Sequence, residues 1–450
     1  MNLKIIIKNV GANSLTMGII MLFRLLSVPV FIKFWGVDLY GEWIVLNALT
    51  AYFAMTDIGL NTATANMVSC HYVNKEFQKC DTLINNNIFF IIATFLLLFM
   101  VLLGINELNI LSNLFQFKLI SNKTLQIGTF LLFGQVFVGI LNNLLSTIYR
   151  ATNYFAKGVM IDNVIRIAEN SVLLFGVAAN LSILSILLLG LIVKVFGILF
   201  KFFDSRKYYK FSIGFQYVRY NELKQIFIPS ISFFTYPIAN SFSFQGYTLV
   251  INFILGSAAV VVFNTTRTLV NFIRTGIEIL HNSVWPELSL AFGKQDKSTM
   301  RVIHRYTLLT SFTIAILSSV FLGLFGRHIY LIWTGYKIEF DSLLFYLFIL
   351  AILSNTLWSS SAVILNSTNN HKGLSFLYLS LTILTFGIAT LVVSLSKTIS
   401  FIPIFFILMD LLLINYVIKK SLFLTDDSLS GFTKSVFRVY NVFTIHKNRR

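Results

Sequence analysis

The chain has 450 residues, of which 56% are hydrophobic and only 12% are charged. Soluble globular domains carry about 25% charged residues, so this composition excludes an ordinary soluble protein and indicates one that lies mostly within a membrane. The net charge of +17 is typical of a membrane protein whose basic residues gather on its cytoplasmic side, and we expect no nucleic-acid partner.

Neither the two cysteines, Cys70 and Cys80, nor the six histidines show metal-ligand spacing. We therefore predict no metal site, no cofactor and no catalytic residue, and inert histidines.

Twelve stretches of the chain have the roughly 20 mostly apolar residues that a transmembrane helix needs. They are residues 11–35, 40–63, 83–104, 126–148, 158–179, 181–203, 225–252, 256–280, 306–325, 342–365, 374–395 and 399–418. The longest polar interruption, residues 201–224, divides them into six and six. The sequence thus predicts an all-α membrane protein of about 12 transmembrane helices in two six-helix halves. The predicted parts are an N-terminal half (1–203), a cytoplasmic linker loop (204–224), a C-terminal half (225–421) and a basic cytoplasmic tail (422–450).

Lysine and arginine residues accumulate on one side of the predicted spans. With the N-terminus in the cytoplasm, 24 of the 35 basic residues fall on the cytoplasmic side and 6 on the outer side. Because basic loops tend to stay in the cytoplasm, we predict a multi-pass protein with both termini cytoplasmic and an even number of spans. The apolar stretch after Lys4 and Lys8 is longer than a signal-peptide core, so we expect it to be the first retained helix.

The two halves show one sign of an internal repeat. Gly36 follows the first span and Gly256 follows the seventh, and each precedes a helix with polar residues on one face. Paired repeats of this kind are how many transporters build alternating access. The sequence identity between the halves is poor, and the repeat is therefore a hypothesis.

A few charged residues lie inside the otherwise apolar spans. They are Arg24, Asp162, Arg166, Glu169, Lys194, Arg267, Arg274, Glu278 and Asp410. A charge near the bilayer centre costs about 2.5–3.5 kcal/mol, so such residues normally face a water-filled cavity or a partner. The spans also carry polar residues at helical spacing, among them Asn47, Asn142, Asn271 and Asn355. One such stripe is explained by helix packing, whereas several together predict a central polar, cationic lumen.

Two interpretations compete for most of these charges. Arg166 lies four residues after Asp162 and three before Glu169, and Arg274 lies four before Glu278, so local ion pairs that only lock helices fit as well as a role with cargo. Lys194, between Gly190 and Gly197, fits helix packing equally well. Arg24 and Arg267 have no acid at this spacing, which favours contact with cargo.

The types of residue in the predicted lumen indicate an anionic, sugar-bearing cargo. Guanidinium groups bind phosphate or carboxylate through two oxygens at once, and amide groups suit sugar hydroxyls. The predicted cargo residues are Arg24, Arg267, Arg274, Arg166, Lys194, Asn47, Asn142, Asn271 and Asn355. The deepest carboxylates, Asp57, Glu278 and Asp410, are the candidates for binding a coupling proton or Na⁺.

Residues 36–43, Gly-Val-Asp-Leu-Tyr-Gly-Glu-Trp, and residues 57–60, Asp-Ile-Gly-Leu, resemble the opening of the O-antigen and capsular polysaccharide flippases. These form the polysaccharide transporter branch of the multidrug/oligosaccharidyl-lipid/polysaccharide (MOP) exporter superfamily. The position of Arg24 and the stretch Asn264-Thr-Thr-Arg267 agree with this resemblance. The motif match is concentrated in the first eighty residues.

The resemblance implies a flippase rather than an enzyme. Its cargo would be an O-antigen or capsule repeat unit on undecaprenyl pyrophosphate, moved by alternating access from the cytoplasmic to the periplasmic leaflet of the bacterial inner membrane. In the family, lumen cations such as those at Arg24, Arg267 and Arg274 hold this cargo. The implied partners are the lipid-linked oligosaccharide, the bilayer, a polysaccharide polymerase and a chain-length regulator.

Three alternatives remain open at this point. A cation-coupled multidrug antiporter of the same superfamily typically has an acidic residue in its first helix, where this chain has Arg24. A lipid II flippase usually has two more spans than this chain supplies. An enzyme such as a polysaccharide polymerase would carry a long, charged outer loop, and the largest outer loop here (105–125) holds only Glu107, Lys118 and Lys123.

Overall fold

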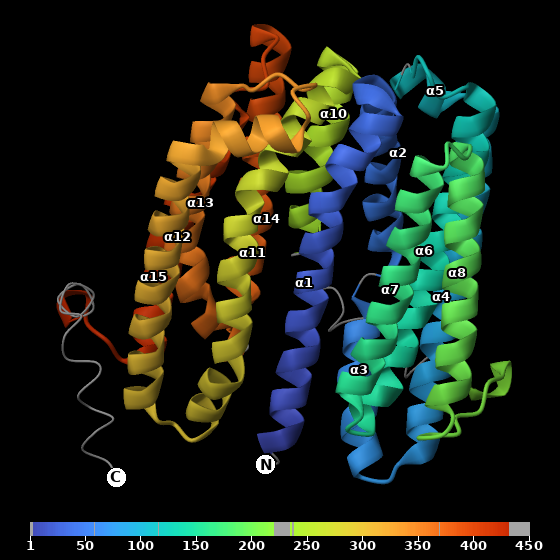
Figure 1. Cartoon of the computed structure of the whole chain (residues 1–450). Coiled ribbons are helices and arrows are strands. Elements are labelled where there is room, and N and C mark those ends of the chain that lie inside the picture. Colours follow the sequence, from blue (N-terminus) through green and yellow to red (C-terminus); the bar gives the residue numbers. More distant parts are fainter. Residues whose placement is uncertain are drawn as a thin grey trace. The chain divides into compact units, whose positions relative to one another are not determined.

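The computed structural model describes residues 3–57, 59–115, 117–219, 235, 238–368 and 370–431, and every regular element among them is a helix. Figure 1 shows the chain. The α-helices are α1 (Leu3–Phe34), α2 (Gly36–Ala54), α3 (Leu60–Val73), α4 (Phe77–Glu107), α5 (Ile110–Phe115), α6 (Asn122–Ala151), α7 (Phe155–Ala178), α8 (Ile183–Ser205), α10 (Tyr247–Leu255), α11 (Ser257–Gly293), α12 (Lys297–Trp333), α13 (Ser342–Ser367), α14 (Lys372–Ser396) and α15 (Ile402–Thr425). Shorter turns of other helix types are η1 (Met55–Asp57), η2 (Phe215–Tyr217) and η3 (Phe242–Gly246).

The helices have the length and composition of membrane spans. Within the described residues, 8 helices are long and apolar enough to cross a membrane, and the bent pair of α2 with η1 and α3 makes up to 9. Helices α7 and α11 also have sufficient length, with 24 and 37 residues, and both carry charged side chains. The protein therefore has an all-α membrane fold. The predicted seventh span (225–252) lies partly outside the described residues, and a total of twelve stays a prediction.

The chain forms two compact units. The N-terminal unit comprises residues 1–262 and 333–338, and the C-terminal unit comprises residues 263–332 and 339–450. Helix α10 packs with the first unit. It contacts α2 and α5, and the side-chain amide of Asn252 donates a hydrogen bond to the carbonyl oxygen of Phe115 over 3.1 Å.

Both glycines of the predicted repeat have a positive φ angle. Gly36 has φ = +75° at the start of α2, and Gly256 has φ = +88° immediately before α11. Glycine adopts such angles without the steric cost that a side chain imposes. Gly41 serves a different purpose, because a Cβ atom there would lie 2.3 Å from the carbonyl oxygen of Ser257. Glycine at this position lets α2 approach the first residue of α11.

Glu42, in the same motif, anchors the segment between α5 and α6. Its side chain is 1% exposed, and its carboxylate accepts hydrogen bonds from the backbone amides of Lys118 and Ile120 over 2.6 and 2.7 Å. A buried carboxylate is stable where several N–H donors satisfy it. The motif that carries the family resemblance is thus structural in this part of the molecule.

The first part of the predicted linker packs against α4. The side chain of Asn85 donates to the carbonyl oxygen of Ser212 over 2.7 Å and accepts from the amide of Gly214 over 2.9 Å. The side chain of Asn86 bonds both backbone groups of Arg219, over 3.1 and 2.8 Å. Each of the two side-chain amides thus both donates to and accepts from the backbone of residues 212–219.

Candidate functional site

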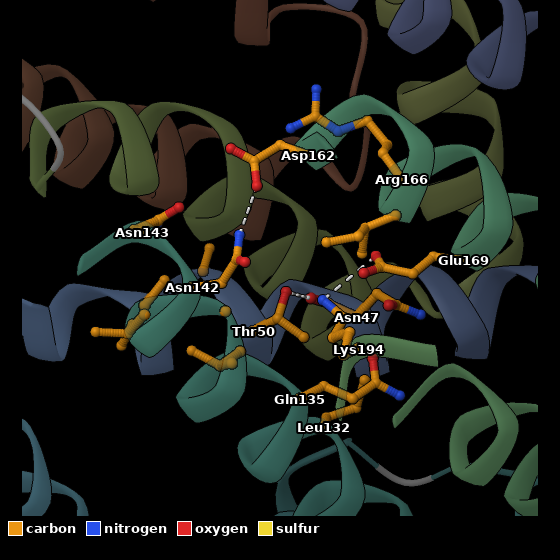
Figure 2. Close-up of a pocket in the computed structure, with 16 residues that line it drawn as sticks. Asn47, Thr50, Leu132, Gln135, Asn142, Asn143, Asp162, Arg166, Glu169 and Lys194 are labelled. Atoms are coloured by element: carbon orange, nitrogen blue, oxygen red, sulfur yellow. Dashed lines mark hydrogen bonds and ion pairs between the residues drawn. The ribbon is translucent and has the colours of Figure 1, made fainter. Parts of the chain in front are cut away.

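A polar cavity lies within the N-terminal unit. Its volume is about 490 Å³, and residues of α2, α6, α7 and α8 line it. Figure 2 shows the polar side chains that converge on it, and we refer to it as the N-terminal cavity. Its polar lining residues are Asn47, Thr50, Gln135, Asn142, Asn143, Asp162, Arg166, Glu169 and Lys194.

Helical spacing explains why each helix supplies these groups on one face. On α7, Asp162, Arg166 and Glu169 are separated by four and three residues, which places them on one stripe. Glycine residues let α8 come close to its neighbours. A Cβ atom at Gly197 would lie 2.7 Å from the side chain of Ile165, and one at Gly190 would lie 3.2 Å from the amide of Gln135.

The two carboxylates of α7 pair with lysines of α8. Nζ of Lys201 lies 2.6 Å from Oδ1 of Asp162, and Nζ of Lys194 lies 3.4 Å from Oε2 of Glu169. Both the acids and the lysines are seven residues apart, so the antiparallel helices align the two pairs. Arg166 thus lies between two ion pairs that join α7 to α8. The sequence suggested that Arg166 itself could pair with Asp162 and Glu169, but both acids pair with lysines instead.

Lys201, the first residue of the predicted polar interruption, lies on α8, and its side chain is fully buried. Besides Asp162, it donates to Oγ of Ser146 over 2.7 Å and to the carbonyl oxygen of Asn142 over 3.2 Å. The spacing of seven residues from Lys194 was the signal in the sequence that these two lysines share a face.

Two polar atoms of lining residues have no hydrogen-bond partner among the described residues. They are Nη1 of Arg166, a donor, and Oδ1 of Asn142, an acceptor, and both atoms are buried. The other end of the Asn142 amide donates to Oδ1 of Asp162 over 2.8 Å, as Figure 2 shows. Buried polar atoms are costly when unsatisfied, so these two positions are suited to a ligand or water.

The charges around this cavity do not cancel. Three cations, Arg166, Lys194 and Lys201, face two carboxylates, Asp162 and Glu169. With all five groups ionised the site carries one excess positive charge. The guanidinium of Arg166, whose Nη1 is unbonded within the described chain, is the group that carries this excess.

The remaining predicted cargo cations lie elsewhere. Arg24 is an exposed residue of α1 and does not line the N-terminal cavity. In the C-terminal unit, Arg267 is 8% exposed, and its guanidinium contacts the Asn264 amide oxygen and stacks 5.1 Å from the Phe263 ring centre. A central lumen that includes these residues stays a prediction.

Arg274 and Glu278 form the local ion pair that their spacing suggested. Nε of Arg274 lies 3.1 Å from Oε1 of Glu278. Arg274, a predicted cargo cation, and Glu278, a predicted coupling acid, are therefore bonded to each other. Asn271 lies on the same helix and is half-buried.

The two other predicted coupling acids are both hydrogen-bonded. Asp410 of α15 is 1% exposed, and it accepts hydrogen bonds from Ser354, Asn355 and Trp358 of α13 over 2.8, 3.2 and 2.7 Å. Asn355 therefore serves as a partner of Asp410. Asp57 accepts from the backbone amide of Asn61 over 3.0 Å, which satisfies a free N–H at the start of α3.

No family model matches the chain, and no curated protein sequence matches it. Solved structures do share its fold. An inward-facing multidrug resistance MATE family transporter of the MOP superfamily superposes with a TM-score of 0.70 at 12% identity, over 91% of this chain and 96% of that one. A MATE protein in complex with MaL6 gives 0.64 at 13% identity, over 94% and 97% of the two chains.

A third structure is a MOP superfamily transporter from Pyrococcus furiosus, for which a binding pocket of reverse polarity suggests a different function. It gives a TM-score of 0.62 at 14% identity, over 92% of this chain and 96% of that chain. At these identities the likeness is one of fold. The protein thus shares the fold of MATE transporters.

Proposed function

We propose that the protein is a membrane transporter that flips an oligosaccharide linked to undecaprenyl pyrophosphate, such as an O-antigen or capsule repeat unit. The observation that carries this proposal is the excess positive charge of the N-terminal cavity, centred on Arg166. The fold shared with known transporters supports transport rather than catalysis. The motif resemblance at residues 36–43 and 57–60 supports the polysaccharide branch.

The unsatisfied atoms of the cavity match the chemistry of such a cargo. Hydrogen bonds from a guanidinium to a phosphate or carboxylate oxygen are charge-assisted and stronger than neutral ones, which suits Nη1 of Arg166. A sugar hydroxyl can donate to Oδ1 of Asn142. The volume of about 490 Å³ falls within the range of small-molecule sites, roughly 300–1,000 Å³, and accommodates part of an oligosaccharide head.

A second candidate is a cation-coupled multidrug antiporter. The structural neighbours support it, since two of them are multidrug resistance MATE family transporters. A cationic drug needs a carboxylate, and both carboxylates of the cavity have lysine partners. A drug would have to displace Lys194 or Lys201, whereas an anion is met by the excess charge of Arg166. A lipid II flippase would use the same cavity chemistry, because that lipid also carries a pyrophosphate.

We also propose that the protein is inserted in a bacterial inner membrane with both termini cytoplasmic. It would cooperate there with a polysaccharide polymerase and a chain-length regulator. Arg24, Arg267 and Arg274 would bind cargo in a state in which both halves face one lumen. The ionic coupling of transport would use Asp57, Glu278 or Asp410.

The test is flipping of a fluorescent undecaprenyl-pyrophosphate oligosaccharide in proteoliposomes. Arg166→Ala should slow flipping at least tenfold, because one to two charge-assisted hydrogen bonds of about 1.5–3 kcal/mol each are lost. Arg166→Lys should retain part of the rate, since it keeps the charge without the planar fork. Arg150→Ala, an exposed arginine at the end of α6, is the matched control and should flip at the wild-type rate.

A cationic dye in the same liposomes separates the two candidates. Dye export that is lost in Glu169→Gln and unchanged in Arg166→Ala, with no flipping of the lipid-linked sugar, would establish the multidrug alternative. Flipping of lipid II in preference to the oligosaccharide lipid would establish the third candidate.

A further inference from the structure

Two buried histidines of the C-terminal unit contact consecutive serines of α13. His281 of α11 is 9% exposed and His304 of α12 is fully buried. Nε2 of His281 lies 3.2 Å from Oγ of Ser311 in α12 and 3.2 Å from Oγ of Ser360 in α13. Nε2 of His304 lies 3.0 Å from Oγ of Ser361, the next residue of α13. The two rings thus connect three helices through adjacent serines.

Serine is a partner that tolerates either protonation state of a histidine. A hydroxyl group both donates and accepts, so it can donate to the bare nitrogen of a neutral ring or accept from the N–H of a charged one. Histidine is the side chain whose ordinary titration lies between pH 5 and 8. Proton uptake at this cluster therefore changes its charge without requiring the loss of a hydrogen bond.

Three acids on or next to the surrounding helices have bonding partners of their own. On α11, Glu278 is bonded to Arg274 over 3.1 Å. Asp427, which follows α15, is bonded to Arg305 of α12 over 2.6 Å. Asp410 of α15 is held by three donors of α13, and α13 itself contains no acidic or basic residue.

We propose that His281 and His304 form a proton-binding pair that controls how tightly α11, α12 and α13 pack. With both rings neutral, the serine hydrogen bonds hold the three helices together. Each proton taken from water places a positive charge in a buried site, which is costly. Acidification should therefore loosen the junction of the three helices.

Hydrogen exchange of the full chain in lipid nanodiscs tests this proposal at pH 7.5 and 5.5, after correction for the intrinsic pH dependence of exchange. In the wild type, the opening equilibrium of residues 275–285 should rise on the order of tenfold at the lower pH. The double variant His281→Gln, His304→Gln keeps side chains that bond serine and cannot take up a proton, and its rise should be less than twofold. His328→Gln replaces an exposed histidine of α12 and should behave as wild type.

An equal rise in the wild type and the double variant would overturn the proposal. If the double variant does not fold, NMR of the wild type labelled at its histidine rings gives the answer. Two rings assigned to His281 and His304 that become protonated between pH 8 and 5, while the exchange of α11 stays unchanged, would equally overturn it. Neither readout involves cargo, so failure here leaves the proposed transport function untouched, and the reverse also holds.

Discussion

Lys201 sets the charge of the N-terminal cavity although it does not line it. Its buried ammonium neutralises Asp162, and through Ser146 and the backbone of Asn142 it ties α8 to α6. Because Asp162 is engaged, its carboxylate is not available to neutralise Arg166. A residue outside the cavity lining thus contributes to the excess positive charge around Arg166.

Breaking this pair should destabilise the protein measurably. Removal of one partner of a buried ion pair costs about 3–5 kcal/mol, and the 26% exposure of the Asp162 side chain places the effect near the lower end. We expect Asp162→Asn to lower the melting temperature of the detergent-solubilised protein more than Lys201→Met. The reason is that Asp162→Asn leaves the fully buried ammonium of Lys201 without its carboxylate. The double variant should recover most of the loss.

The double-mutant cycle separates pairing from general disruption of the helices. If the two single losses simply add in the double variant, the residues do not interact in the folded protein, and the charge assignment of the cavity fails.

At the scale of elements, the first part of the linker acts as a strap along α4. Asn85 and Asn86 bond the backbone of residues 212, 214 and 219 with both ends of their amides. The charged and aromatic composition of the linker suggests a loop without contacts to the helices. In the structure, these hydrogen bonds instead hold the segment that follows α8 against α4. They thereby also restrain the end of the helix that carries Lys194 and Lys201.

Removing one clamp should release this strap. Each lost hydrogen bond contributes about 0.5–1.5 kcal/mol, so Asn86→Ala, which loses two, should raise the open population roughly tenfold. Trypsin cleavage after Lys207, Lys210 or Arg219 should accelerate by a similar factor, since cleavage follows the open state when closing is fast.

Gln78→Ala, an exposed residue of the same helix, is the control and should be cut at the wild-type rate. Equal cleavage of Asn86→Ala and wild type would show that the amide does not hold the segment.

At the scale of the whole molecule, the all-α membrane fold was predictable because apolar length is a local property of the sequence. The polar faces of α2, α6 and α7 were predictable for the same reason, and the cavity unites Asn47, Asn142, Arg166 and Lys194 from those predictions. The cross-helix pairing of Lys201 was not found, because it depends on the register of two helices. The contacts of α10 with α2 and α5 were not predictable either, because they join residues far apart in the sequence.

The orientation of the protein in the membrane remains the broadest prediction, and it rests on the 24-to-6 distribution of basic residues. Cysteines introduced at Lys210 and Lys337, both exposed, should differ in their labelling by a maleimide. The exposed native thiol is first removed by Cys70→Ser. A membrane-impermeant maleimide should label Lys337→Cys in intact cells, and Lys210→Cys only in inverted vesicles. The buried thiol of Cys80 should remain unlabelled in both and serves as the internal control. Labelling of Lys210→Cys from outside the cell would show that the topology is the reverse of the predicted one. The leaflet from which the proposed flippase takes its cargo would then be reversed as well.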